Sequence, residues 1–295
     1  MATRFELVLQ GVDTIALRAA GEEALAEVGR IENQLSLYRP GSEISQVNSR
    51  ASRGAVQVSP EVFSLLQHAA KMTAETDGAF DITIAPLVRC WGFMGANGQM
   101  PSPEEIAVAR ETVGMNLVEL DAARRTVRFT REGVMLDLGA IGKGYAVERG
   151  AELLREAGVT SALFHGGTST TCAIGHPADD DAWRVSFDVP ERYGGTSLPI
   201  LPEMRLRDVA MSVSAIWGRA FQSGKKTFGH VIDPRTGMPV EGTLLTAVVL
   251  PSATETDALS TALLTLGRAG HQKMNQLRSE IRSVVVGSDG VFESL

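Results

Sequence analysis

Residues 137–145, Asp-Leu-Gly-Ala-Ile-Gly-Lys-Gly-Tyr, constrain the fold of this chain more than any other part of its sequence. They are typical of a strand end, a tight turn carrying Lys143, and the start of a helix that we expect over residues 145–157. Such a turn presents free backbone N–H groups and the positive end of the helix dipole, so it suits a diphosphate. The same residues also fit an ordinary strand-to-helix connection with a solvated lysine, and both interpretations stay open.

Two common nucleotide-binding patterns are excluded for this segment. Gly144 follows Lys143, whereas a P-loop has Ser or Thr after its lysine. The glycines at 139, 142 and 144 also do not form the Gly-x-Gly-x-x-Gly pattern of dinucleotide-binding folds. A diphosphate site here would therefore be of another kind.

Residues 257–261, Asp-Ala-Leu-Ser-Thr, form a second candidate segment. Ser252 and Glu255 resemble a capping box that starts a helix, and Asp257 and Thr261 then share one helix face. Carboxylate and hydroxyl oxygens are ligands that Mg²⁺ accepts. The alternative is an acid that interacts with the helix dipole beside a solvated threonine.

Further candidates are a histidine and several aromatic residues. Residues 230–237, His-Val-Ile-Asp-Pro-Arg-Thr-Gly, place His230 beside an Asp-Pro turn. Residues 91–93, Trp-Gly-Phe, and Tyr38 are more typical of core aromatics than of a stacking site. Three other histidines fit structural or surface roles: His68, His176 and His271.

Composition limits the class of protein. A chain of 295 residues with 44% hydrophobic residues can bury a large core. Its net charge of -7 argues against binding to nucleic acid. Cys90 and Cys172 indicate neither a disulfide framework nor a zinc knuckle. The sequence as written shows no leader and no apolar membrane span, so we expect a soluble cytoplasmic protein, periplasmic or lipid-anchored only if its start omits a leader.

Helical and strand patterns alternate without repeats or a linker, so we expect one α+β domain over residues 1–295. Helices are predicted around residues 24–35, after Ser59-Pro60 and after Ser102-Pro103, and a hairpin over residues 118–129. The predicted later strands cover residues 162–164, 183–189, 204–214, 245–250 and 283–286.

The sequence resembles the ApbE family of flavin transferases. The likeness extends in order from residue 1 to residue 263 and rests on motifs at residues 35–38, 42–45, 78–83, 91–93, 137–145, 230–237 and 257–263. It implies a single elaborated, T-fold-related α+β domain with a mixed or antiparallel sheet and flanking helices.

The resemblance implies a specific reaction. Enzymes of this family cleave FAD at its diphosphate and transfer FMN through a phosphoester bond to a Ser or Thr of a partner flavoprotein, releasing AMP. They require Mg²⁺, so the implied cofactor is Mg²⁺, and FAD is the substrate. The implied protein partner is an acceptor flavoprotein that carries a Ser/Thr flavinylation motif.

The family's site residues can be carried onto this sequence. The implied metal ligands are Asp257, Thr261 and the backbone carbonyl of Ala140, with Ser260 a weaker candidate. The implied FAD-contacting residues are Met1, Tyr38, Trp91, Gly92, Phe93, Asp137, Lys143, His230 and Val231. Either His230 or Asp257 could take the proton of the acceptor hydroxyl, and both assignments stay open.

Two segments depart from the family pattern. Residues 165–169, His-Gly-Gly-Thr-Ser, replace the usual Asn-x-Gly-Gly-Asp, which removes an acid that His165 could replace as a polar group. Residues 212–217 replace the usual Ser-Gly-Asp. Two alternatives therefore accompany the transferase hypothesis: an FAD pyrophosphohydrolase giving FMN and AMP, and a non-catalytic FAD-binding or flavin-delivery protein.

Overall fold

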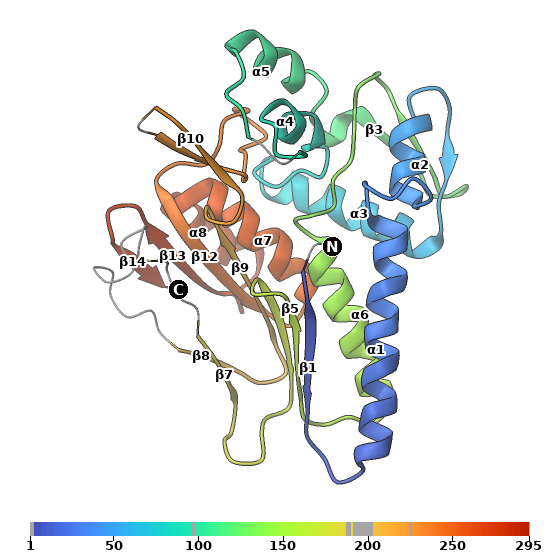
Figure 1. The fold of residues 1–295 in the computed structure, drawn as a ribbon, viewed down its shortest axis with the longest axis vertical. Helices are drawn as coiled ribbons and strands as arrows, with labels where there is room; N and C mark the ends of the chain where they lie inside the picture. The colour runs from blue at the N-terminus through green and yellow to red at the C-terminus, as the bar shows by residue number, and fades with distance from the viewer. Residues whose placement is uncertain (1–2, 96–97, 187–189, 191–202, 225, 295) are drawn as a thin grey trace. The chain divides into compact units, whose positions relative to one another are not determined.

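A seven-stranded sheet organises the first of two compact units in the computed structural model of this chain (Figure 1). The structure describes residues 3–95, 98–186, 190, 203–224 and 226–294. Unit 1 comprises Met1–Glu32, Ile141–Ser214 and Gly242–Leu295. Unit 2 comprises Asn33–Ala140 and Ala215–Glu241. Each unit therefore combines segments that are far apart in the sequence.

The sheet of unit 1 has the strand order β1-β5-β6-β9-β12-β13-β14 (Figure 1). Its strands are β1 (Phe5–Leu9), β5 (Ala162–Gly166), β6 (Thr170–Ile174), β9 (Ala210–Ala215), β12 (Thr243–Leu250), β13 (Arg282–Gly287) and β14 (Phe292–Ser294). The pairs β1–β5, β5–β6, β6–β9, β12–β13 and β13–β14 are antiparallel. Every residue of β12 is buried, because this strand lies inside the sheet and both of its faces are covered.

Helices cover one face of this sheet and a short ribbon covers the other. The helices of the unit are α1 (Thr14–Leu35), α6 (Gly142–Glu156), α7 (Ala253–Leu266) and α8 (Gly270–Leu277), with a 3₁₀ turn η3 at Gly267–Ala269. Helix α6 approaches β5 so closely that a Cβ atom at Gly150 would lie 2.3 Å from the Phe164 ring. On the opposite face, β7 (Trp183–Val185) and β8 (Met204–Leu206) enclose a cluster with Leu163 and Met211.

Unit 2 is a separate α+β arrangement. Its elements are α2 (Glu43–Arg50), β2 (Val56–Gln57), α3 (Pro60–Glu75), α4 (Ala85–Cys90), α5 (Pro103–Arg110), η1 (Met115–Leu117), β3 (Val118–Asp121), β4 (Thr126–Phe129), β10 (Ala220–Ser223) and β11 (Lys226–Gly229). Its sheets are β2-β4-β3 and β10-β11. One core cluster joins Leu87, Trp91 and Phe93 to Phe228 and Ile232.

Elements with local start signals are confirmed. Ser59 caps α3 with Pro60 at its first turn, and Ser102 forms a capping box with Glu105 at the start of α5. The helix after the glycine-rich segment is α6, and residues 118–129 form the predicted hairpin of β3 and β4. The predicted first helix is α1, which begins at Thr14.

Two strand predictions need correction. Residues 204–214 form two strands, β8 and β9, in different sheets. The chain breaks between them because Asp208 adopts a left-handed conformation, with φ of 53°, and accepts a hydrogen bond from Gly175 N at 2.7 Å. Of the strand predicted at 183–189, β7 covers Trp183–Val185, and residues 187–189 lie outside the described part of the chain.

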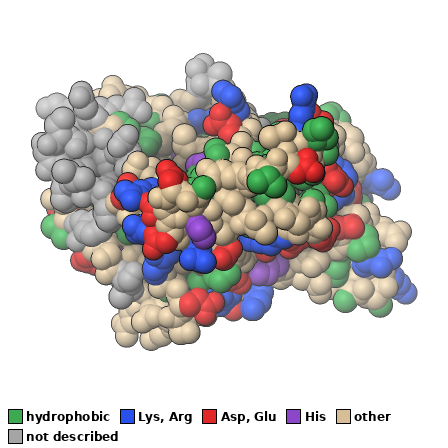
Figure 2. All heavy atoms as spheres, turned by 90° about the horizontal axis from the view of Figure 1, so that it is seen from below, with side chains coloured by type: hydrophobic (Ala, Val, Ile, Leu, Met, Phe, Trp, Pro, Cys, Tyr) green, Lys and Arg blue, Asp and Glu red, His purple; other side chains and the backbone are tan. Residues whose placement is uncertain are grey.

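The surface carries charges of both signs. On the face shown in Figure 2, Lys and Arg side chains are interspersed with Asp and Glu side chains. Asp180, for example, accepts from both Arg184 and Arg205. Among the described residues, no helix is long and apolar enough to cross a membrane.

We predict that Gly144→Ala destabilises unit 1. A Cβ atom at residue 144 would lie 2.1 Å from the Ala253 carbonyl oxygen and 2.7 Å from the Asp257 Cβ, so α6 and α7 would have to separate. We expect a loss of about 1–3 kcal/mol in the free energy of unfolding, measured by denaturant titration. Gly29→Ala in α1 is the matched control, because a Cβ atom at residue 29 would meet nothing within 4 Å, and it should not destabilise.

Acidification should destabilise the protein through His271. This side chain of α8 is 7% exposed, and its Nδ1 lies 3.2 Å from Ser283 Oγ. Burial lowers the pKa of His271 from its usual 6.5, against a smaller opposing effect of Glu293. The stability that the neutral ring contributes is therefore present above about pH 6.5 and is lost as the pH falls through the folded-state pKa.

His271→Gln should accordingly reduce the fall in unfolding free energy between about pH 7 and pH 5. The exposed His176→Gln is the control and should leave that fall as in the wild type. An unchanged pH profile for His271→Gln would contradict the assignment.

Candidate functional site

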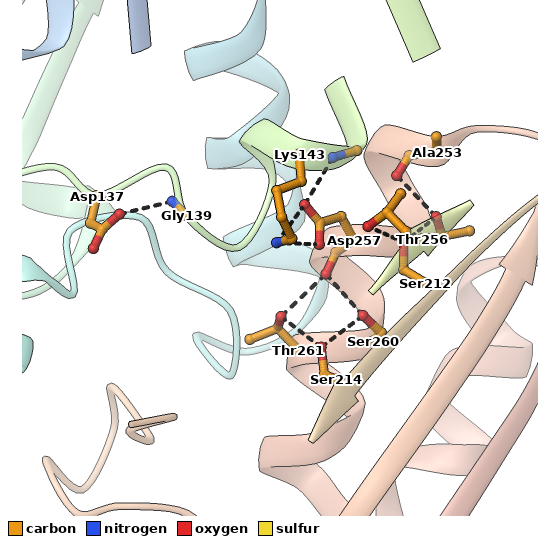
Figure 3. Close-up of polar contacts among 12 residues, drawn as sticks. Asp137, Gly139, Lys143, Ser212, Ser214, Ala253, Thr256, Asp257, Ser260 and Thr261 are labelled. Atoms are coloured by element: carbon orange, nitrogen blue, oxygen red, sulfur yellow. Dashed lines mark hydrogen bonds and ion pairs between the residues drawn. The ribbon is translucent and has the colours of Figure 1, made fainter. Parts of the chain in front are cut away.

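Asp257 caps a helix to which it does not belong. It lies one turn into α7 and is 3% exposed. Gly144 N of α6 donates to its Oδ2 at 2.9 Å, and Lys143 Nζ lies 3.1 Å from its Oδ1 (Figure 3). Helix α6 begins at Gly142; Ile141, its N-cap residue, provides no side-chain cap, and α6 has no acid in its first turn. Asp257 therefore supplies the acceptor and the negative charge that this helix start lacks.

The start of α7 is satisfied separately. Ser252 Oγ accepts a hydrogen bond from Glu255 N at 3.2 Å, as predicted for its N-terminus. The Glu255 carboxylate does not complete a capping box, because it pairs with Arg278 at 2.7 Å. The dipole that Asp257 satisfies is thus that of α6.

Three hydroxyl groups lie beside Asp257. Thr261 Oγ1 is 3.2 Å from the Asp257 carbonyl oxygen and 3.2 Å from Ser214 Oγ (Figure 3). Ser260 Oγ is 3.1 Å from the same carbonyl oxygen and 2.9 Å from Ser214 Oγ. Ser214 of β9 thus contacts the hydroxyls of both Ser260 and Thr261, and Thr261 is not simply solvated.

A second group of hydroxyls continues this contact between β9 and α7. Ser212 Oγ lies 2.8 Å from Thr256 Oγ1 and 3.2 Å from Thr170 Oγ1, and all three residues are buried. This polar contact was not predicted from the sequence. Its signal was the alternation of Ser212 and Ser214, which places both on one face of a strand.

The residues around Asp257 fit a hard cation. No cluster of three or more His, Cys, Asp or Glu side chains suited to a metal occurs in the part of the chain that the structure describes. A cation at Asp257 would therefore draw on hydroxyl and carbonyl oxygens, the donor types that Mg²⁺ accepts. Of the two α7 hydroxyls that reach the Asp257 carbonyl, that of Thr261 is half-buried whereas that of Ser260 is fully buried, so Thr261 is the more accessible.

Unit 2 groups several other predicted site residues. Asp137 Oδ1 accepts from Gly139 N at 2.8 Å, which forms the turn at the start of the glycine-rich segment. Partial burial and then the Asp137 carboxylate raise the pKa of Tyr38, against the opposing effect of Arg219. Tyr38 is 61% exposed, so its ring is accessible for stacking. Arg219, which sequence reasoning missed, also donates to the Phe93 carbonyl at 3.0 Å.

The aromatic residues of the 91–93 motif are core residues, as expected from their residue types. Trp91 is fully buried, and its Nε1 donates to the Gly237 carbonyl at 2.8 Å. Phe93 is 4% exposed and meets the His230 ring edge-on, with centroids 6.5 Å apart. A contact of this motif with FAD stays a prediction.

The other predicted site residues are Gly92, Val231, Ala140 and Met1. Gly92 has φ of 73°, a conformation suited to glycine. Val231 accepts from Val240 N at 2.9 Å, and Ala140 is the last residue of unit 2 before Ile141. Met1 lies outside the described residues.

His165 belongs to the sheet. Its Nδ1 lies 3.1 Å from Thr171 Oγ1 on the neighbouring strand, and burial lowers its pKa. Its neighbours Phe164 and Gly166 both face α6. Because side chains alternate along a strand, the His165 ring lies on the opposite face and does not replace an acid beside Asp257.

Lys143→Met should destabilise unit 1 by about 1–3 kcal/mol, because it removes the cation beside a buried carboxylate. Adding Asp257→Asn should recover part of that loss, so a double-mutant cycle of unfolding free energies measures the coupling. Arg18→Met, which breaks an exposed ion pair in α1, should stay close to the wild type. Additive losses for Lys143 and Asp257 would contradict the pairing.

Comparisons with known proteins place both units in one family. The sequence model of the ApbE family matches residues 1–285. The FAD:protein FMN transferase of Haemophilus influenzae is 28% identical over 252 residues, covering 83% of this chain and 72% of the relative. The FAD:protein FMN transferase of Salmonella typhimurium is 27% identical over 280 residues, which cover 93% of this chain and 79% of the relative.

Solved structures agree with these sequence matches. The crystal structure of the ApbE protein of Thermotoga maritima aligns with a TM-score of 0.86 and 26% identity, covering 98% of this chain and 96% of that one. The apo flavinyl transferase ApbE of Pseudomonas stutzeri aligns with a TM-score of 0.81 and 26% identity, covering 99% and 94%. The fold is α+β, as expected from the sequence, and the chain belongs to the ApbE family.

Proposed function

We propose that this protein is a Mg²⁺-dependent FAD:protein FMN transferase. It cleaves FAD at the diphosphate, attaches FMN through a phosphoester bond to a Ser or Thr of a partner flavoprotein, and releases AMP. The observation that carries the proposal is the buried Asp257 carboxylate, held against the start of α6 and Lys143 in a chain of the ApbE family. Relatives named FAD:protein FMN transferase support the reaction class.

The proposed metal ligands are Asp257, Thr261 and the backbone carbonyl of Ala140. Asp257 and Thr261 present a carboxylate and a hydroxyl from one turn of α7. Bound Mg²⁺ would neutralise charge on the diphosphate oxygens. Ala140 belongs to unit 2, and its assignment rests on the family resemblance.

The start of α6 is the proposed diphosphate contact. Its first-turn N–H groups and the Lys143 ammonium offer hydrogen-bond donors and positive charge to phosphate oxygens. Lys143 is 23% exposed at its side chain, so it is accessible to a ligand while it pairs with Asp257. The other proposed FAD contacts are Met1, Tyr38, Trp91, Gly92, Phe93, Asp137, His230 and Val231.

His230 is the better candidate for the base that accepts the proton of the acceptor hydroxyl. Both carboxylate oxygens of Asp257 are already engaged, Oδ2 by Gly144 N and Oδ1 by Lys143. These two contacts leave fewer lone pairs of the carboxylate open toward an acceptor hydroxyl. The imidazole of His230 is half-buried beside Phe93, and histidine is the side chain that most often serves as a general base.

The test incubates the purified protein with FAD and Mg²⁺, with and without an acceptor domain that carries a Ser/Thr flavinylation motif. AMP, FMN and the mass of the acceptor are followed together. A mass gain of one FMN matched by AMP supports transfer. Free FMN with AMP would instead indicate a pyrophosphohydrolase, and intact bound FAD in all conditions would indicate a binding protein. Either result overturns the proposal.

Asp257→Ala should lower the transfer rate by about 10²–10³-fold and remove its response to Mg²⁺, because the charged metal ligand is lost. Asp179→Ala removes an exposed acid of the same unit and is the matched control. Transfer by Asp257→Ala that still depends on Mg²⁺ as in the wild type would contradict the ligand assignment.

A further inference from the structure

We propose that Ser214 is a positioning residue that orients the Thr261 hydroxyl for the cation. This inference rests on the proposed function, because it concerns the same metal site. Its basis is the contact of Ser214 Oγ with Thr261 Oγ1 at 3.2 Å and with Ser260 Oγ at 2.9 Å (Figure 3). Ser214 acts through Thr261.

The hydroxyl groups of Ser260 and Thr261 both reach one acceptor of α7, the Asp257 carbonyl oxygen, which has too few lone pairs for all the donors around it. The Asp257 carbonyl accepts the N–H of Thr261 in the regular helix pattern. The Ser260 and Thr261 hydroxyls also lie within reach of it, at 3.1 and 3.2 Å. A carbonyl oxygen has two lone pairs, so it cannot hold all three donors well. One hydroxyl proton needs another acceptor, and Ser214 Oγ is within reach of both.

One direction of donation satisfies every group. Thr261 donates to Ser214, Ser214 donates to Ser260, and Ser260 donates to the Asp257 carbonyl. The Asp257 carbonyl then accepts two hydrogen bonds, and the proton of Thr261 points at Ser214. Because a hydroxyl binds a cation through its lone pairs, this arrangement leaves both lone pairs of Thr261 available to a cation.

Ser214 is held firmly enough for this role. It lies in β9, where the neighbouring Val213 N donates to the Ser169 carbonyl at 2.7 Å and Ser212 pairs with Thr170 of β6. Ser214 and Thr261 are both half-buried, whereas Ser260 is fully buried. The pair that we assign to cation positioning is therefore the accessible end of the hydroxyl cluster.

The experiment measures Mg²⁺ affinity by calorimetry on the full chain, alone and with ADP as a diphosphate probe. Ser214→Ala should weaken Mg²⁺ binding about tenfold, the size of loss typical when a partner of a metal ligand is removed. Ser214→Thr keeps a hydroxyl and should restore most of the affinity. Thermal unfolding without Mg²⁺ checks that each variant is folded.

Matched variants separate positioning from a general loss of structure. Ser212→Ala removes a buried hydroxyl two residues earlier in β9, so it should change stability but leave Mg²⁺ affinity within about twofold of the wild type. If Ser214 acts only through Thr261, adding Ser214→Ala to Thr261→Val should weaken Mg²⁺ binding no further than Thr261→Val alone.

The outcomes distinguish this inference from the proposed function. Wild-type Mg²⁺ affinity in folded Ser214→Ala, with binding abolished in Asp257→Ala, overturns the role of Ser214 alone. Equal losses in Ser214→Ala and Ser212→Ala also overturn it. A wild-type protein that takes up no Mg²⁺, even with ADP, overturns both the inference and the proposed metal site.

Discussion

The hydrogen bond from the start of α6 to Asp257 is the interaction on which the site of unit 1 depends. Helix starts leave N–H groups without partners, and α6 has neither a side-chain hydrogen bond from its N-cap residue nor an acid in its first turn. Asp257 of α7 supplies the acceptor, which requires the two helices to approach closely at Gly144. Gly144 of the glycine-rich segment is therefore a steric requirement of this contact, because a side chain there would collide with α7.

The same contact explains how a buried carboxylate can serve both structure and binding. Lys143 lies 3.1 Å from the Asp257 carboxylate and places a positive charge beside this buried negative charge. A cation at Asp257 and the Lys143 ammonium repel each other, whereas a diphosphate attracts both. Cation and diphosphate are for this reason expected to bind more tightly together than separately.

Hydroxyl groups lie at the contact of α7 with β9 next to Asp257, and those of Ser260 and Thr261 reach its backbone carbonyl oxygen. Ser212, Ser214, Thr256 and Ser260 satisfy one another across the contact of β9 with α7. Satisfied hydroxyls of this kind fix orientation at little desolvation cost. In unit 2, by contrast, the aromatic pair Trp91 and Phe93 is used for the core that supports His230.

The sequence by itself determined the family, the α+β class and the elements with local signals. Ser59 and Ser102 start helices through contacts within four residues, and α6 follows its glycine-rich turn. It also marked Asp257 and Thr261 as oxygen donors on one helix face. Only the tertiary structure decided that Asp257 caps α6, across 113 residues of sequence, and that Ser214 meets Thr261. Those contacts depend on how α6, α7 and β9 pack, which local propensity and side-chain periodicity do not encode.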